Sequence, residues 1–144
     1  MLRKKRTYLI IIISVLISGC DYQYVEDEQF VGKWELKGRS SFTGMQIEIQ
    51  KEEGVLKGKI LKLPESEIVN MFAKEGDIWV KNIKRTSNYS FKLSETRIAS
   101  ELFSMYDLNT STVFKAEFIN ENKIGLAERN GDPQNSNIYY ERIK

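Results

Sequence analysis

The chain has 144 residues, with 22 lysines and arginines, 20 aspartates and glutamates, no histidine and one cysteine. This length suits a single small domain. One cysteine excludes a disulfide-stabilised scaffold, and the lack of histidine excludes histidine-based metal and acid–base sites. Four basic residues and no acidic one precede Cys20, so the rest of the chain carries 18 basic and 20 acidic residues, a net charge of −2. This mildly acidic remainder argues against nucleic acid as a partner.

The first 19 residues have the order of a secretory signal peptide. Basic residues at positions 3–6 precede an apolar run over positions 8–17, and the small residues Ser18 and Gly19 follow. The apolar run has about ten residues, whereas a helix needs roughly 20 to cross a membrane. We therefore predict that residues 1–19 direct export and are removed, rather than remaining as a transmembrane anchor.

The end of this leader resembles the lipobox of bacterial lipoproteins. Residues 17–20 read Ile-Ser-Gly-Cys, which is an aliphatic residue, two small residues and a cysteine. The resemblance implies cleavage between Gly19 and Cys20 and acylation of Cys20, with palmitate among the acyl chains. Two or three chains anchor a protein durably in a membrane. The expected location is the bacterial cell envelope, on the inner or outer membrane, facing the periplasm or the cell surface. A buried free cysteine and a simple secretory cleavage are the alternatives.

An acidic segment follows the cysteine. Positions 21–29 hold four acidic residues and no apolar period, which is typical of an unstructured spacer. Because anionic lipids repel acidic side chains, residues 20–29 are expected to form a tether that holds the domain away from the bilayer. The folded domain is then expected over residues 30–144.

Alternating apolar and polar residues predict about eight short strands in this domain. After Ile60 the apolar residues change parity, which indicates a bulge or an end of strand pairing there. Sequential strands with short connections favour an antiparallel meander, closed into a barrel so that no strand edge is exposed; an open sandwich is the alternative. The expected strands cover residues 30–37, 45–50, 55–63, 77–84, 89–93, 112–118, 123–129 and 137–144.

Two segments have helical rather than strand spacing. After Pro64, apolar residues in 65–73 are spaced for one or two helical turns. Between Glu95 and Tyr106, apolar residues recur with a period near 3.6, which predicts an amphipathic helix. Such a helix could cap the barrel mouth, plug it or contact a partner protein.

Four short motifs resemble those of small lipocalin-like, calycin-type bacterial envelope proteins. The resemblance implies a barrel in which Trp34 lies at the closed end beneath Arg142, as a structural lock without catalytic meaning. Such a barrel can enclose one small ligand or be filled by its own side chains. The motifs are Gly32-Lys33-Trp34, Ile47-Glu48-Ile49, Leu56-Lys57-Gly58-Lys59-Ile60 and Tyr140-Glu141-Arg142-Ile143.

Aromatic residues in the second half of the chain are the candidates for a ligand pocket. Aromatic side chains suit an apolar pocket with a few polar groups, although an ordinary packed core uses the same residues. The candidates are Trp79, Phe91, Phe103, Tyr106, Phe114 and Phe118. We expect a non-enzymatic lipoprotein, without cofactor or metal, that binds a small apolar or amphipathic ligand. The alternative is a filled barrel that binds an envelope protein as an accessory, inhibitor or immunity-type lipoprotein.

Catalysis has little support in the sequence, and no catalytic residue is assigned. Without histidine, acid–base chemistry would depend on carboxylates, tyrosine or lysine. A carboxylate-dependent hydrolase would need Glu117 and Glu128 to face inward within about 10 Å of each other.

Overall fold

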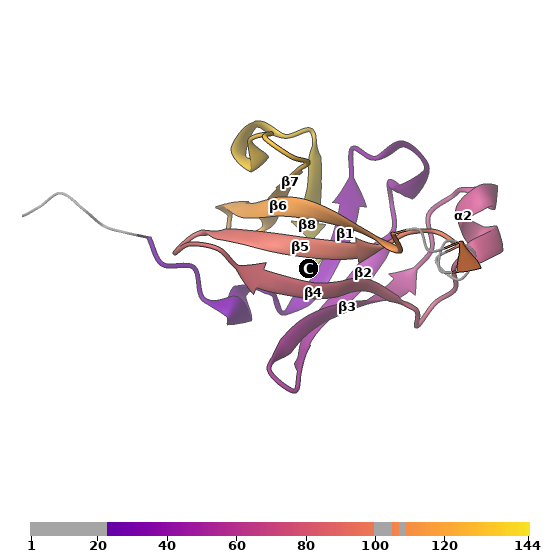
Figure 1. Cartoon of the computed structure of the whole chain (residues 1–144), viewed down its shortest axis with the longest axis horizontal. Helices are drawn as coiled ribbons and strands as arrows, with labels where there is room; N and C mark the ends of the chain where they lie inside the picture. The colour runs from indigo at the N-terminus through magenta and orange to yellow at the C-terminus, as the bar shows by residue number, and fades with distance from the viewer. Residues whose placement is uncertain (1–22, 100–104, 107–108) are drawn as a thin grey trace, which may run out of the picture.

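The structure is a computed structural model that describes residues 23–99, 105–106 and 109–144. Eight strands form a closed antiparallel barrel in which each strand pairs with the next along the chain and the last returns to the first (Figure 1). The predicted mainly-β meander barrel is therefore confirmed. The strands are β1 (Gly32–Lys37), β2 (Gln46–Glu52), β3 (Val55–Lys62), β4 (Ile78–Arg85), β5 (Ser90–Thr96), β6 (Ser111–Asn120), β7 (Lys123–Ala127) and β8 (Ile138–Arg142).

The alternation of side chains fixes which face of each strand meets the core. Trp34 and Leu36 on β1 and Ile47 and Ile49 on β2 are fully buried, whereas the residues between them are partly exposed. A register slip of one residue would reverse these faces and expose the whole apolar set. The pairing of β1 with β8 that closes the barrel therefore follows from the same pattern that forms each hairpin.

One irregularity of the sheet was expected. On the β2–β3 pair, Ile47 lies opposite Ile60 but Gln46 lies opposite Lys62, so Leu61 is an extra residue. Of the two alternatives predicted near Ile60, a bulge or an end of pairing, the structure shows the bulge. The extra residue turns the following segment, so that Leu63 packs against the core from outside the strand.

The predicted short helix after Pro64 is present as α2 (Glu67–Phe72). Ser66 caps it, since its hydroxyl accepts a hydrogen bond of 3.4 Å from the Val69 amide. The other helix prediction is wrong at its start. Glu95 and Thr96 belong to β5 and pair with β6, and residues 100–104 of that prediction lie outside the described residues.

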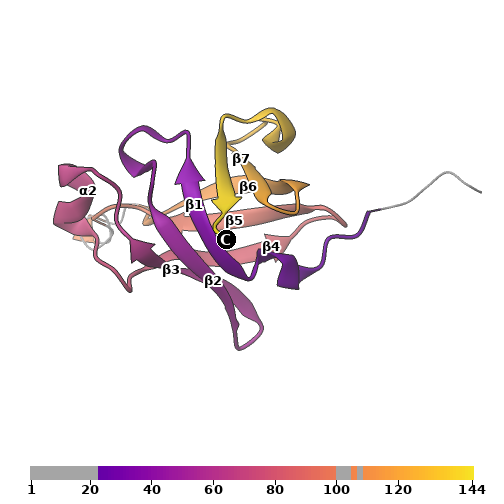
Figure 2. The same ribbon diagram turned by 180° about the vertical axis from the view of Figure 1, so that it is seen from behind.

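Short 3₁₀ turns complete the described elements: η1 (Asp27–Phe30), η2 (Ser40–Phe42) and η3 (Pro133–Asn135). The N-terminal segment and the β4–β5 turn lie at one end of the long axis, on the left in Figure 1, and α2 lies at the other (Figures 1 and 2). We call these the closed end and the open end. The two ends differ in chemistry.

Candidate functional site

The closed end is sealed by packed aromatic and cationic groups. Arg142 places its guanidinium carbon 4.1 Å from the centre of the Trp34 ring and donates to the Gln29 carbonyl at 2.6 Å. The Trp34 indole donates to the Phe30 carbonyl at 2.7 Å, and the Phe30 ring lies 4.7 Å from that of Phe91. These groups fill this end of the barrel, so its role is structural.

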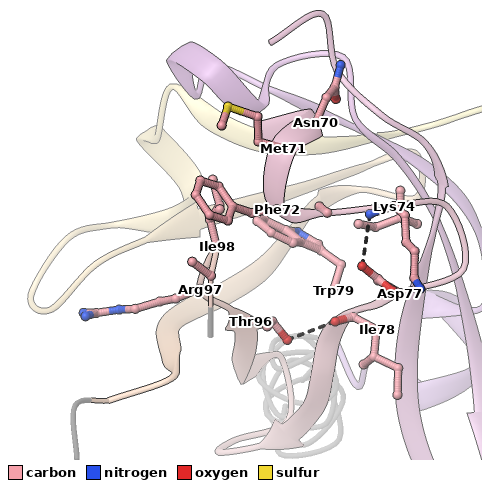
Figure 3. A pocket seen from close by; sticks show the side chains of 13 residues that line it. Asn70, Met71, Phe72, Lys74, Asp77, Ile78, Trp79, Thr96, Arg97 and Ile98 are labelled. Atoms are coloured by element: carbon pink, nitrogen blue, oxygen red, sulfur yellow. Dashed lines mark hydrogen bonds between the residues drawn. The ribbon is translucent and has the colours of Figure 1, made fainter. Parts of the chain in front are cut away.

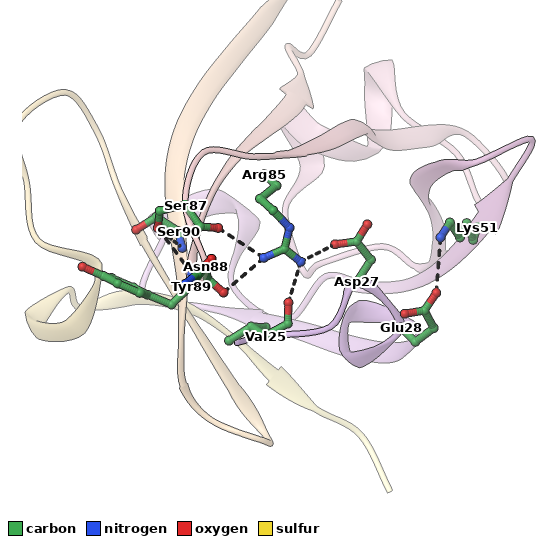
Figure 4. Close-up of polar contacts among 9 residues, drawn as sticks. All are labelled: Val25, Asp27, Glu28, Lys51, Arg85, Ser87, Asn88, Tyr89 and Ser90. Atoms are coloured by element: carbon green, nitrogen blue, oxygen red, sulfur yellow. Dashed lines mark hydrogen bonds and ion pairs between the residues drawn. The ribbon is translucent and has the colours of Figure 1, made fainter. Parts of the chain in front are cut away.

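The N-terminal segment is bound to this closed end, as Figure 4 shows. Arg85 on β4 donates to the Val25 carbonyl at 2.5 Å and to the Asp27 carboxylate at 2.7 Å. The Val25 amide donates to the Asn88 carbonyl at 2.9 Å, and the Val25 side chain is buried. Residues 24–30, which we call the N-terminal strap, therefore belong to the folded domain, although residues 20–29 were expected to form a tether.

The open end holds a pocket between α2, the start of β4 and the residues after β5 (Figure 3). This mouth pocket has a volume of about 800 Å³. Apolar groups dominate one side, where Phe72 and Ile98 lie close to Trp79. Thr96 and the Lys74–Asp77 turn supply polar groups on the other.

A second, smaller pocket adjoins the mouth pocket through the shared residues Trp79, Thr96, Arg97 and Ile98. This head pocket has a volume of about 360 Å³. Its remaining lining residues are Arg39, Phe42, Glu95 and Thr112. The two pockets therefore place a space with one apolar side beside a space that Arg39 and Glu95 line.

A buried polar network forms the floor of the head pocket. Arg39, from the β1–β2 connection, donates to one oxygen of the Glu95 carboxylate. Tyr140 on β8 donates to the other oxygen at 2.5 Å, and the Trp79 indole donates to the Tyr140 hydroxyl at 2.9 Å. Every buried polar side-chain atom of the described residues has a partner, so this network satisfies the demand that burial imposes.

Aromatic rings surround the Arg39 guanidinium. Its central carbon lies 4.6 Å from the Phe42 ring centre, 5.1 Å from that of Phe114 and 6.0 Å from that of Trp79. Cations are stabilised over aromatic faces at these distances. Arg39 is therefore fixed between an anion below and aromatic faces beside it.

Burial dominates the ionisation of this network. It raises the pKa of Glu95 above its usual range, although the Arg39 charge and the hydrogen bonds from Tyr140 and Arg39 oppose the shift. The pKa of Tyr140 is raised well above its usual value, first by burial and then by the neighbouring Glu95 charge. Tyr140 consequently keeps its proton at neutral pH and remains a hydrogen-bond donor.

The aromatic residues proposed for a pocket do not lie together. Trp79 lines both pockets, and Phe114 contacts Arg39 beneath them. Phe91 and Phe118 lie at the closed end against Phe30. Tyr106 is exposed, and Phe103 lies outside the described residues.

The sequence interpretation missed Arg39, Glu95 and Tyr140 as a group. The signal for Glu95 was its position after Phe91 and Leu93, where strand alternation places an acidic side chain in the core. Tyr140 likewise has core parity in β8. Arg39 gave no signal, because it enters the barrel from a connection and not from a strand.

The carboxylates considered for hydrolysis do not meet inside the barrel. Glu117 is buried on the outer face of β6, beneath η3, where it accepts hydrogen bonds from Ser90 and, at 3.1 Å, from Gln134. Glu128 is exposed. Among the described residues, no three acidic or cysteine side chains are grouped as metal ligands, and within those same ranges no helix is long and apolar enough to cross a membrane.

Comparison with known proteins finds no matching family model, no matching curated protein and no matching solved structure.

Proposed function

We propose that the protein is a lipid-anchored, non-enzymatic component of the bacterial cell envelope whose barrel binds a small amphipathic ligand at its open end. The mouth pocket carries the binding part of this proposal. Its volume of about 800 Å³ falls within the range of about 300 to 1,000 Å³ that small-molecule pockets occupy. The anchor is supported by the leader and by residues 17–20.

A protein partner at the same end is the second candidate. The α2 helix turns Ile68 and Met71 outward, with exposed fractions of 63% and 76%, and soluble monomers rarely expose contiguous apolar groups without a use for them. Arg39 and Tyr140 occupy the barrel interior beneath the pockets, which agrees with a filled barrel.

Quenching of tryptophan fluorescence tests the ligand proposal. The full chain, in phosphatidylcholine nanodiscs, is titrated with ω-bromododecanol, because bromine quenches tryptophan only on contact. Trp79 lines the mouth pocket, whereas Trp34 is fully buried at the closed end and serves as the internal reference. We expect saturable quenching beyond that given by lipid partitioning in empty nanodiscs. Its absence would overturn the ligand proposal.

A matched pair of variants assigns the quenching to the pocket. Phe72→Ser removes an apolar ring from the wall of the mouth pocket and is expected to weaken the binding of ω-bromododecanol about tenfold. Val113→Ser is the control, because Val113 and Phe72 have the same exposed fraction, 48%, but Val113 does not line the pocket. Native mass spectrometry of the chain purified from its own membrane tests the second candidate, which predicts a retained protein instead of a small molecule.

A further inference from the structure

The head pocket contains an arginine whose hydrogen-bonding capacity is only partly used. A guanidinium carries five N–H donors. In the described part of the chain, the Arg39 side chain donates only to Glu95, through Nη1. About one fifth of the Arg39 side chain, 19%, remains exposed, and that exposed part lines the head pocket.

The position of Arg39 is fixed before any ligand arrives. Glu95 and the rings of Phe42 and Phe114 hold the guanidinium in place. Arginine is well suited to oxyanions because its planar edge can donate two parallel hydrogen bonds to a carboxylate or phosphate. A donor fixed in advance also loses less side-chain entropy when the ligand binds.

The charges around the two pockets favour an anion. Arg39, Arg97 and Lys74 are the basic lining residues, and Glu95 and Asp77 are the acidic ones. Thr112 also lines the head pocket, and its hydroxyl, which accepts from Arg97 Nε at 3.5 Å, can donate to a ligand oxygen.

We propose that the ligand is an anionic amphiphile, whose oxyanion accepts hydrogen bonds from Arg39 in the head pocket while its apolar chain lies along Phe72, Trp79 and Ile98 in the mouth pocket. The pockets adjoin at Trp79, so one ligand can extend from the head pocket into the mouth pocket. This inference rests on the proposed function and names the class of ligand. The head is a fatty-acid carboxylate or an alkyl phosphate, since both offer the same acceptor geometry.

Amphiphiles with one chain and different heads provide the test. The full chain in nanodiscs is titrated with ω-bromododecanoate, ω-bromododecyl phosphate, ω-bromododecanol and ω-bromododecyl trimethylammonium, with Trp79 quenching as the signal. We expect at least one anion to bind about tenfold more tightly than the alcohol, as one charge-assisted hydrogen bond would give, and the cation to bind most weakly. The ratio between carboxylate and phosphate distinguishes the two sources.

Variants with opposite expected effects test the role of Arg39. Arg39→Gln should abolish the preference for the anion while leaving the affinity for the alcohol within about twofold. Glu95→Gln removes the competing carboxylate and should tighten anion binding about tenfold. Lys92→Gln, on the exposed outer face of β5, removes the same charge as Arg39→Gln and should change neither affinity. A purely structural role for the pair would instead weaken every amphiphile equally in both variants.

The outcomes distinguish a failure of the anionic head group from a failure of the proposed ligand-binding function. If no amphiphile quenches Trp79, the proposed function fails. If the alcohol or the cation binds as tightly as the anions, the function stands and the anionic head is overturned. This comparison uses the unmodified chain, so it remains decisive even if Arg39→Gln does not fold.

Discussion

Tyr140 satisfies two polar atoms that would otherwise be buried without partners, the Trp79 indole nitrogen and one oxygen of the Glu95 carboxylate. It accepts from the Trp79 indole and donates to Glu95. Tyr140→Phe would remove both hydrogen bonds while preserving the ring. Because an unsatisfied buried polar group costs about 1 to 3 kcal/mol, we expect the free energy of unfolding to fall by at least about 2 kcal/mol, as measured by urea denaturation.

The neighbouring tyrosine provides the control for this prediction. Tyr139 is half-buried, with the Lys123 ammonium 4.0 Å from its ring centre. Tyr139→Phe keeps the ring and is expected to change the unfolding free energy by less than about 0.5 kcal/mol. Equal losses in the two variants would contradict the role given to the Tyr140 hydroxyl.

Glu95 predicts how stability depends on pH. Its pKa is raised in the folded state, chiefly by burial, so the folded chain takes up a proton at a higher pH than the unfolded chain does. The contribution of Glu95 to stability therefore rises as pH falls from the raised folded pKa toward the unfolded pKa, about 4.3. Urea denaturation of the native chain and of Glu95→Gln across this window isolates the effect, because the other carboxylates are common to both. A difference independent of pH would contradict it.

At the scale of elements, η3 lies on β7 at a position that only glycine fits. A Cβ atom on Gly125 would lie 1.9 Å from the Pro133 carbonyl oxygen, a backbone atom that cannot rotate away. We expect Gly125→Ala to lower the free energy of unfolding by about 3 kcal/mol or more, measured by thermal or urea denaturation. Gly58→Ala, whose new methyl would meet only side-chain atoms at 3.1 Å or more, should cost clearly less.

The strands were predictable because each carries its own alternating signal. β2 shows this well: Ile47 and Ile49 point inward and the residues between them outward. The error at Glu95 has a physical cause, since one acidic residue at an inward position breaks the apolar alternation and makes a helical period look better. The alternation ends there because the core itself becomes polar, around Arg39 and Tyr140.

The candidate site was less predictable than the strands. Its polar members come from β5, β8 and the β1–β2 connection, and barrel closure alone brings them together. No local pattern carries such a long-range contact. The aromatic candidates were dispersed for the opposite reason, because apolar periodicity marks burial but not the end of the barrel at which a residue is buried.

At the scale of the whole molecule, the two ends of the barrel differ. The proposed lipid anchor would therefore fix which end faces the membrane. The strap is held at the closed end by Arg85, and the five residue steps from Cys20 to Val25 can span at most about 18 Å. The ten residues of β6 extend about 30 Å along the strand. With acyl chains on Cys20, the closed end should face the membrane and the mouth should lie away from it.

Lipid-depth quenching measures this orientation. A fluorophore is attached to the full chain in liposomes through either Asn88→Cys, at the closed end, or Met71→Cys, beside the mouth; both positions are exposed. Lipids spin-labelled in the head group should quench the first fluorophore strongly and the second weakly. Equal quenching, or stronger quenching at Met71→Cys, would contradict the orientation.

The strap also limits where a ligand bound at the mouth could be released. A barrel tethered loosely could bend its mouth down to the bilayer and exchange ligand with the leaflet that anchors it. By holding residues 24–30 against the barrel, Arg85 leaves little length for that movement. A ligand released at the mouth would then enter the aqueous compartment, where a soluble carrier or the facing membrane could receive it, so the protein would deliver outward from its own membrane and not within it.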